Sequence, residues 1–424
     1  FNDFNISILN NPLIPIMATL LKFDCLNLYK IAIFSITLEK THNVGFMKTE
    51  QIGWSHKEGW SGETDSGALE DAQLVLLFGP PSILKNETLF EKIRQSYPHA
   101  YILSGSTAGE ILKTRVYDNS LVATAIRFEN TVIKPIHVKI KNRKDSLSIG
   151  EKLVRTLDQE GLCHVFILAD GLNVNGSELV KGMIKHLPKG VVITGGLTGD
   201  GGEFKETLVG ANQMPESKVV TALGFYGTHL KVHYGSVSGF KPFGPERKIT
   251  SSENNVLYEL DGEPALGLYK KYLGDRIQDL PTQCFYFPLY YQTSQMEKGV
   301  VRTILGMDEK TGSMTFAGDL EQGGTVQLMK TNIDNLVSGA EEATKACRDS
   351  GASSPGMAIL MSCIGRKIIL KQRVEEEIEA VEEIFGPKTQ LTGFYSYGEI
   401  APIANSMHSH LHNQTMSITT FTEI

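Results

Sequence analysis

The residues with the clearest chemical potential follow an apolar segment near the middle of the chain. Asp170 and Gly171 come directly after the run 164–169, and Asn175 lies a few residues further on. A carboxylate can accept a hydrogen bond from an ammonium group, an amide can donate and accept, and glycine permits close approach of the main chain. The loop precedes a predicted helix, whose N-terminus suits an anion. The same loop could instead be an Asx-turn that caps this helix, and both interpretations remain open.

A second polar group lies in the last third of the chain. Arg366 follows the apolar run 356–361, and its guanidinium could hold a carboxylate by two hydrogen bonds, as an amino acid or a haem propionate requires. Cys363 could supply a thiolate to a soft metal or to haem iron. The alternatives are a surface arginine and an inert buried cysteine. We favour the binding function for Arg366 and the inert interpretation for Cys363.

A tight turn further along the chain combines aromatic, hydroxyl and acidic side chains. Tyr395 and Tyr397 offer stacking faces with hydroxyl groups, Ser396 lies between them, and Glu399 adds a charge. Such a set suits a small amphipathic ligand. The alternative is that the tyrosines pack in the core and the glutamate caps the turn.

Three histidines alternate near the C-terminus. In a strand, His408, His410 and His412 would share one face and could bind zinc or copper. We expect instead that His408 and His410 lie in a loop and that His412 and Asn413 enter the last strand. His412 is the best single candidate for an axial haem ligand or for a hydrogen-bond donor to a ligand. A histidine that only anchors the loop is the alternative.

Composition excludes several classes of protein. The chain has 424 residues and a formal net charge of -7, which argues against non-specific nucleic-acid binding. Its five cysteines form no CxxC pair, so a disulfide framework and a thiolate zinc site are not expected, and a reducing cytoplasm is the natural compartment. No apolar run reaches the roughly 20 residues that a membrane-spanning helix needs.

The first 46 residues differ in texture from the rest. Residues 1–46 are rich in Asn, Ile and Leu, show no clear period and begin with Phe1. Our hypothesis is that Met47 is the native start and that the preceding sequence is translated upstream sequence. The alternative is a genuine extension that packs on the core.

Three segments share one plan, which predicts an α/β fold of mixed sheets built from repeated β-loop-α-β units. Each segment begins with a continuous apolar run, typical of a strand buried on both faces. A loop, a helical pattern, a short strand with a Gly-containing turn and a further strand follow. The repeats begin at Leu74, His164 and Gly356, and their last strands are predicted at 121–128, 219–225 and 414–421.

Different material separates the second and third repeats. A helix is predicted over 262–274, a hairpin over 301–318 and another helix over 336–351. Pro, Gly and polar residues concentrate in 241–255, where we place the domain boundary. The predicted domains are therefore 47–245 and 246–424.

Familiar catalytic motifs are missing from the sequence. It contains no GxSxG elbow, HExxH, P-loop or GxGxxG that opens a βαβ unit. This favours binding over catalysis. The alternative is an enzyme that acts on a small carboxylated metabolite through Asp170, Arg366 and Glu399.

The ordered motifs SGSTAGEI, ADGLNVNGSELVKGM, ITGGLTGDGG, SCIGR, GFYSYGEIAP and LHNQTMSITTF make the chain similar to FIST proteins, from about Leu74 to Phe421. These proteins combine an N-terminal FIST domain with a FIST C domain. The resemblance implies a cytoplasmic sensory module for small ligands, among them amino acids. Some stand-alone bacterial members resemble haem proteins that sense nitric oxide and signal to a separate histidine kinase. Since no output domain is recognisable, a signalling partner is expected.

The same resemblance supports a shared pocket. Arg366, the turn from Tyr395 to Glu399 and the pair His412–Asn413 all lie within the family motifs. Together with the Asp170 loop, they predict one polar cavity enclosed by loops from both halves of the chain.

Overall fold

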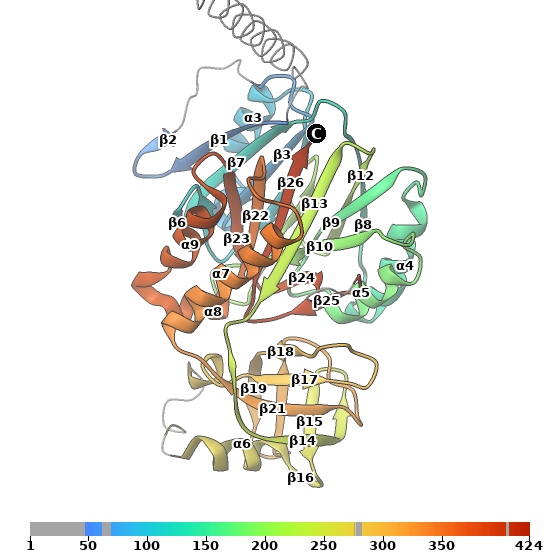
Figure 1. Ribbon diagram of the computed structural model, residues 1–424, viewed down its shortest axis with the longest axis vertical. Helices are drawn as coiled ribbons and strands as arrows, with labels where there is room; N and C mark the ends of the chain where they lie inside the picture. Colours follow the sequence, from blue (N-terminus) through green and yellow to red (C-terminus); the bar gives the residue numbers. More distant parts are fainter. Residues whose placement is uncertain (1–46, 62–68, 275, 277–281, 404–406) are drawn as a thin grey trace, which may run out of the picture. The chain divides into compact units, whose positions relative to one another are not determined.

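The repeats form three mixed sheets, seen in a computed structural model that describes residues 47–61, 69–274, 276, 282–403 and 407–424 (Figure 1). The hypothesis about residues 1–46 falls outside this range. Each sheet has six strands, with the first and second strands of one repeat paired in parallel and the third strand antiparallel to the first. The predicted mixed α/β architecture is therefore confirmed.

The strand orders of the three sheets follow the repeats. Sheet 1 has the order β11-β4-β3-β7-β1-β2, sheet 2 β25-β24-β10-β9-β12-β8, and sheet 3 β13-β26-β22-β23-β5-β6. The bounds are, for sheet 1, β1 Lys48–Ser55, β2 Gly59–Ser61, β3 Leu74–Gly79, β4 Tyr101–Ser106, β7 Ser120–Arg127 and β11 Val209–Ala211; for sheet 2, β8 Val132–Lys139, β9 Leu162–Ala169, β10 Val192–Leu197, β12 Val219–Tyr226, β24 Gly398–Pro402 and β25 Ser409–His412; and for sheet 3, β5 Glu110–Leu112, β6 Arg115–Tyr117, β13 Leu230–Val237, β22 Met357–Cys363, β23 Gln390–Ser396 and β26 Met416–Glu423.

Each sheet is completed by a strand from another repeat. After its Gly-containing turn, the first repeat sends β5 to β23 of sheet 3, the second sends β11 to β4 of sheet 1, and the third sends β24 to β10 of sheet 2. Figure 1 shows this exchange in sheet 2, where the red strands β24 and β25 adjoin the green β10. The exchange is cyclic, so no repeat has a complete sheet of its own.

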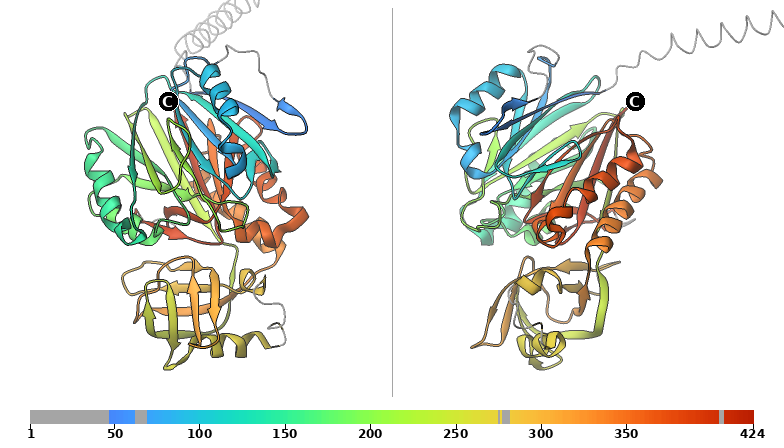
Figure 2. Two further views of the ribbon diagram at one scale, coloured as in Figure 1. Left: turned by 180° about the vertical axis from the view of Figure 1, so that it is seen from behind. Right: turned by 90° about the vertical axis from the view of Figure 1, so that its left-hand side faces the viewer.

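The first strands of the repeats, β3, β9 and β22, are largely apolar because both faces of each sheet are covered there. One core cluster joins side chains of all three sheets, including Leu76, Phe166 and Phe421, and the rings of Phe78 and Phe394 lie 4.7 Å apart. Helices cover the opposite faces, as the second view of Figure 2 shows for sheet 3. Continuous apolar strands are the expected sequence signature of such double coverage.

The helices begin where the sequence supplies caps. The helices beside the three sheets are α2 Pro81–Leu84, α3 Glu87–Ser96, α4 Ser146–Thr156, α5 Gly176–Ile184, α7 Ile333–Asp349, α8 Ile364–Leu370 and α9 Glu376–Phe385. Asn86, Asn175 and Asn332 accept hydrogen bonds from the third residue beyond each cap. Asn175, rather than the nearby Ser177, caps α5.

The segment between the second and third repeats forms an eight-stranded sheet with its own core. The predicted hairpin is β19–β20, and the two predicted helices are α6 and α7. The stretch 241–255, predicted as a boundary, lies mostly in the long strand β14. The elements are β14 Lys241–Glu253, β15 Val256–Leu260, β16 Glu263–Pro264, α6 Ala265–Leu273, β17 Leu289–Gln292, β18 Val300–Arg302, β19 Ile304–Asp308, β20 Ser313–Phe316 and β21 Thr325–Lys330.

Two segments near the predicted site differ from expectation. In the third repeat, β22 is followed at once by α8, which begins at Ile364, instead of by the loop expected after the first strand. His410 and His412, expected in a loop and at the start of the last strand, both belong to β25, while the last strand begins at Met416. Among the described residues, no helix is both long and apolar enough to cross a membrane.

Candidate functional site

A pocket of about 110 Å³ lies where loops of the second and third repeats meet the β18–β20 region. We call it the Tyr397 pocket. Its walls are mainly apolar, and it is far smaller than the roughly 300–1,000 Å³ of pockets for drug-sized ligands. The residues that line it are Arg143; Gly171, Leu172, Val174, Asn175 and Gly176; Leu197 and Phe204; Phe285, Thr303, Leu305, Ala317 and Gly318; and Cys363, Ile364, Gly365, Tyr397, Leu411 and Asn413.

A few polar groups interrupt the apolar lining. The hydroxyl oxygen of Thr303 is buried and has no hydrogen-bond partner in the described part of the chain. Asn413 accepts a hydrogen bond from the Thr303 amide at 3.4 Å. The exposed side chain of Arg143 forms no ion pair or hydrogen bond with any described residue. The pocket therefore offers a buried hydroxyl and an accessible cation to an occupant.

Phe204, from the segment 199–206, forms part of one wall of this pocket. Phe204 stacks on Tyr397 with ring centroids 4.6 Å apart and an interplanar angle of 17°. The Tyr397 hydroxyl donates to Asp200 and accepts from the Gly202 amide at 3.2 Å. Although burial would raise the pKa of Asp200, the hydrogen bonds from Tyr397 and from three main-chain amides outweigh burial and lower this pKa. Asp200 thus fixes the segment through its ionised form.

Replacing Tyr397 by phenylalanine is expected to loosen this wall. The change removes the donor to Asp200 but keeps the ring, so we expect a loss of about 1 kcal/mol in stability and faster proteolytic cleavage within 199–206. Limited proteolysis with mass spectrometry measures the rate. Tyr117→Phe, at an exposed tyrosine on β6, is the control. Equal cleavage rates in both variants would contradict the assigned contact.

The pocket receives some, but not all, of the residues predicted from the sequence. Four of them line it, namely Gly171, Asn175, Tyr397 and Asn413. Six others, Asp170, Arg366, Tyr395, Ser396, Glu399 and His412, are buried side chains outside its lining. The expected single polar cavity around Asp170, Arg366 and Glu399 is therefore not present in the described structure.

The Asp170 carboxylate forms its hydrogen bonds within its own loop and with neighbouring segments. Its carboxylate accepts from the amides of Leu172 and Asn173 at 3.0 Å each, from the amide of Lys218 at 2.6 Å and from the hydroxyl of Thr207. The first two contacts are those of an Asx-turn, one of the two alternatives for this loop. Asp170 shapes the pocket loop without facing the pocket.

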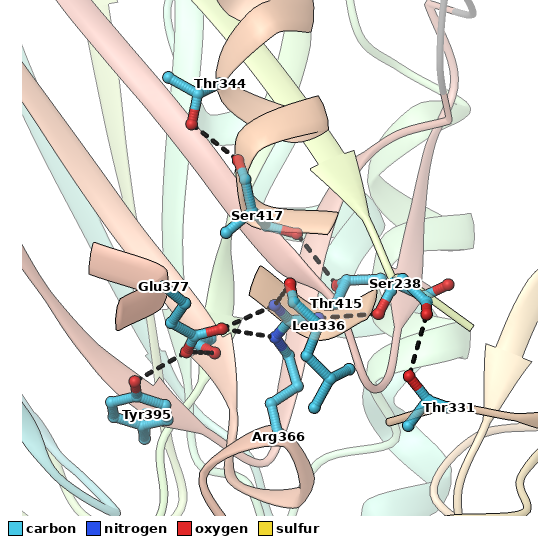
Figure 3. A network of polar contacts seen from close by, with 12 residues as sticks. Ser238, Thr331, Leu336, Thr344, Arg366, Glu377, Tyr395, Thr415 and Ser417 are labelled. Atoms are coloured by element: carbon cyan, nitrogen blue, oxygen red, sulfur yellow. Dashed lines mark hydrogen bonds and ion pairs between the residues drawn. The ribbon is translucent and has the colours of Figure 1, made fainter. Parts of the chain in front are cut away.

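Arg366 lies inside the third repeat, as Figure 3 shows. Its Nε and Nη2 atoms donate to Glu377 at 2.9 and 2.6 Å, while Nη1 and Nη2 donate to the carbonyls of Ser238 and Leu336 at 2.8 Å each. Tyr395 donates its hydroxyl to the same Glu377 at 2.7 Å. Both expected ligand contacts, Arg366 and Tyr395, thus belong to a buried structural network.

Two repeats contain the same buried glutamate arrangement. Glu399 accepts from the Ser396 hydroxyl at 2.6 Å and from the amide and hydroxyl of Thr415 at 3.2 and 2.8 Å. Glu110 accepts from Thr107 and from the amide and hydroxyl of Ser120 in the same way. Burial, partly offset by these hydrogen bonds, raises the pKa of each carboxyl to about 7. Each glutamate joins a turn to the start of its repeat's last strand.

These glutamates are expected to make stability depend on pH. In the folded protein the pKa of Glu399 is about 7, whereas the ordinary pKa of a glutamate is 4.5. Protonation of Glu399 therefore stabilises the folded state. This contribution to the free energy of unfolding is complete below pH 4.5 and is lost as the pH rises through 7. Each group accounts for up to about 3 kcal/mol. Urea unfolding between pH 5 and 8 measures this dependence. We expect the free energy of unfolding to fall less over this range in Glu399→Gln than in the exposed control Glu383→Gln. Identical declines would contradict the raised pKa.

The surroundings of His412 do not fit an axial haem ligand. Its Nε2 atom bonds to the carbonyl of Ala401 at 2.9 Å, and burial lowers the pKa of the imidazole to about 3. Cys363 does line the Tyr397 pocket, but burial raises the pKa of its thiol far above the ordinary value. A protonated thiol is a poor ligand for iron. The described residues hold no cluster of three or more metal-ligating side chains.

Sequence reasoning missed most of the apolar lining. Phe204 is exposed and has a φ of 54°, which marks a specific turn in the segment after the second repeat's Gly-rich strand. An aromatic residue in a segment of Gly and charged residues was the available signal. No sequence signal marked Leu305 and Ala317, because the sequence of a hairpin does not reveal which other segments pack against it.

The fold is an α/β arrangement of three mixed sheets, with an eight-stranded sheet between the second and third repeats. Family models match this chain: the FIST N domain matches residues 73–263 and the FIST C domain matches residues 265–402. The chain belongs to the FIST family, whose domains are proposed to sense small ligands in signalling.

Relatives add little about activity. The chain is 24% identical over 270 residues to an uncharacterized protein of Mycobacterium tuberculosis, covering 61% of this chain and 67% of that protein. It is 25% identical over 250 residues to an uncharacterized protein of Methanocaldococcus jannaschii, covering 52% of this chain and 47% of that one. A cyanuric acid hydrolase from A. caulinodans aligns with 6% identity and a TM-score of 0.37 over 89% of this chain and 99% of the hydrolase.

Proposed function

We propose that this protein is a cytoplasmic sensor that binds a small, largely apolar molecule with one carboxylate or amide end, such as an amino-acid-like metabolite, in the Tyr397 pocket. The proposal rests on which segments supply the residues that line the pocket. They are the loop 171–176, the junction of β22 with α8 and the β18–β20 region. A ligand there contacts three segments that are far apart in sequence. It can therefore favour one arrangement of these segments over another.

The chemistry of the lining supports this ligand class. Apolar side chains such as Leu172, Leu305 and Leu411 suit a hydrocarbon body. The unpartnered Thr303 hydroxyl offers one hydrogen bond, and Arg143 offers a charge for a carboxylate near the pocket. Arg143 thus takes the role that the sequence suggested for Arg366.

The stacked pair Phe204 and Tyr397 connects the pocket to the surface of the protein, so that ligand binding can change that surface. Phe204 lines the pocket, whereas Asp200, Glu203 and Glu206 of the same segment line a neighbouring polar groove. A ligand that displaces Phe204 therefore changes the groove, where a partner such as a histidine kinase could read the change. Binding of a signalling partner at this groove is part of the proposal.

Binding without catalysis is preferred over the enzyme alternative. Asp170, Arg366 and Glu399, the groups considered for catalysis, do not share a pocket. The Cys363 thiol, a nucleophile in the lining of the pocket, is kept protonated by its raised pKa. Haem has no role in this proposal. A Soret band in protein purified from haem-supplied cells would contradict that exclusion.

A thermal-shift screen of amino acids and small carboxylic acids tests the proposal. A ligand that binds only the folded protein stabilises it by about 2.7 kcal/mol at 100 times Kd. We expect stabilisation by at least one compound, reduced in Arg143→Gln and unchanged in Lys144→Gln, which removes the neighbouring exposed charge outside the lining. No stabilisation by any compound, or equal stabilisation of both variants, would contradict the proposal.

A further inference from the structure

A second, wider pocket is lined by Asp319, the residue after Ala317 and Gly318 of the Tyr397 pocket. We call it the Arg302 pocket. It has a volume of about 540 Å³ and is lined by residues of α5, β25 and the eight-stranded sheet. Its floor includes Arg302, Tyr291 and His410, none of which lines the Tyr397 pocket.

Arg302 is an arginine buried without a charged partner. Only 5% of its surface is exposed. Nε donates to the carbonyl of Asp319 at 3.3 Å and Nη1 to that of Leu411 at 2.8 Å, while the guanidinium carbon lies 5.7 Å from the centre of the Tyr291 ring. Within the described chain, Nη2 has no hydrogen-bond partner and the guanidinium has no ion pair. One edge of the guanidinium is therefore available to an occupant.

The nearby acid Asp319 offsets this charge only in part. Both oxygens of the Asp319 carboxylate accept from the Asn175 amide, at 3.1 and 3.0 Å, and no ion pair joins Asp319 to Arg302. A buried charge without a partner is costly. Burial lowers the pKa of Arg302 to about 10, although Tyr291 and the charge of Asp319 oppose this shift. An anion at Nη2 would remove much of this cost.

His410 supplies a second donor to the same pocket. It belongs to β25, whose Leu411 carbonyl already binds Arg302. Its imidazole is partly buried and makes no hydrogen bond with the described residues. Burial, and next the charge of Arg302, lower the pKa of His410 to about 4, so the neutral ring can donate one N–H. His410 lines this pocket, whereas His412 is buried and bonds to the carbonyl of Ala401.

We propose that the Arg302 pocket binds a small monocarboxylic acid, with its carboxylate between Nη2 of Arg302 and the imidazole of His410. The guanidinium matches a carboxylate in shape and charge. The apolar lining of Val180, Ile184 and Leu320 suits the carbon chain. The site is independent of the proposed function, because the two pockets share only Leu411.

The remaining charges favour a singly charged ligand over phosphate. Glu178 pairs with Lys181 at 3.4 Å, and Glu321 also borders the pocket. Lys181, which also lines the pocket, offsets Glu178, so Asp319 and Glu321 remain and repel a doubly charged anion more strongly than a monoanion. A phosphate specificity would therefore contradict the assignment.

Ligand-observed NMR titrations with sodium butyrate, sodium 4-methylpentanoate and sodium phenylacetate test the proposal. We expect at least one acid to bind with saturation, and Arg302→Lys and His410→Gln to weaken it at least tenfold. Should Arg302→Lys fail to fold, His410→Gln alone decides. Lys185→Gln, which removes a surface charge near the end of α5 outside the pocket, should bind within twofold of the wild type.

Three outcomes would overturn the assignment. They are failure of every acid to bind, unchanged binding in His410→Gln, and equally tight binding of inorganic phosphate or n-butylammonium. Loss of acid binding in Arg143→Gln instead would assign the site to the Tyr397 pocket. The result therefore separates this proposal from the proposed function.

Discussion

Replacing Arg366 by methionine is expected to lower the free energy of unfolding by about 3–5 kcal/mol. The substitution leaves the Glu377 carboxylate buried without its cation and removes the donors to the carbonyls of Ser238 and Leu336. Urea unfolding followed by circular dichroism measures the loss. The double variant Arg366→Met/Glu377→Leu should recover part of it, because no unpaired charge remains.

Arg373→Met is the matched control for this prediction. Arg373 also forms ion pairs, with Glu376 at 2.7 Å and Asp334 at 2.9 Å, but all three groups are exposed to solvent. Surface pairs add little to stability. A loss in Arg366→Met no larger than in Arg373→Met would contradict the structural role and return Arg366 to consideration as a ligand-binding residue.

Alanine at Gly195 or Gly393 is expected to be still more damaging. These glycines occupy the same position in the second and third repeats, with φ values of 150° and 152°. A Cβ atom at either would lie 1.9 Å from a carbonyl oxygen of the neighbouring parallel strand. Neither strand can move without disrupting its sheet, so we expect a loss of more than about 4 kcal/mol and little folded protein. Soluble yield and thermal unfolding measure the effect.

The first repeat provides the control. Ser104 occupies the corresponding position, opposite Leu77 of β3, and its hydroxyl has no hydrogen-bond partner in the described structure. Ser104→Ala should therefore leave stability nearly unchanged. Wild-type stability in Gly195→Ala and Gly393→Ala would show that the repeats do not place their backbones as described.

The repeats could be predicted from the sequence because burial leaves a strong local signal. Each first strand is continuously apolar, since one face meets the shared core and the other meets helices. The exchange of β5, β11 and β24 could not be predicted. These short strands pair with partners far away in sequence, and nothing in their composition specifies which sheet they join.

The candidate site was predicted only in part, for an equally physical reason. Loop residues such as Asn175 and Tyr397 do reach the pocket, because loops after strands gather at one end of the sheets. The charged residues Asp170, Arg366 and Glu399 looked equally suitable, but each is neutralised or hydrogen-bonded within the core. Sequence alone does not tell a buried charge with an internal partner from one that awaits a ligand.

The most direct test of the account is the set of small molecules that copurify with the protein. Ala317→Trp places a large ring in the Tyr397 pocket, whereas Lys144→Gln changes a nearby exposed side chain outside it. We predict that heat-released extracts, compared by mass spectrometry, contain a small metabolite from the wild type and Lys144→Gln that is absent from Ala317→Trp. The same compounds from all three proteins, or none from the wild type, would contradict a ligand in this pocket.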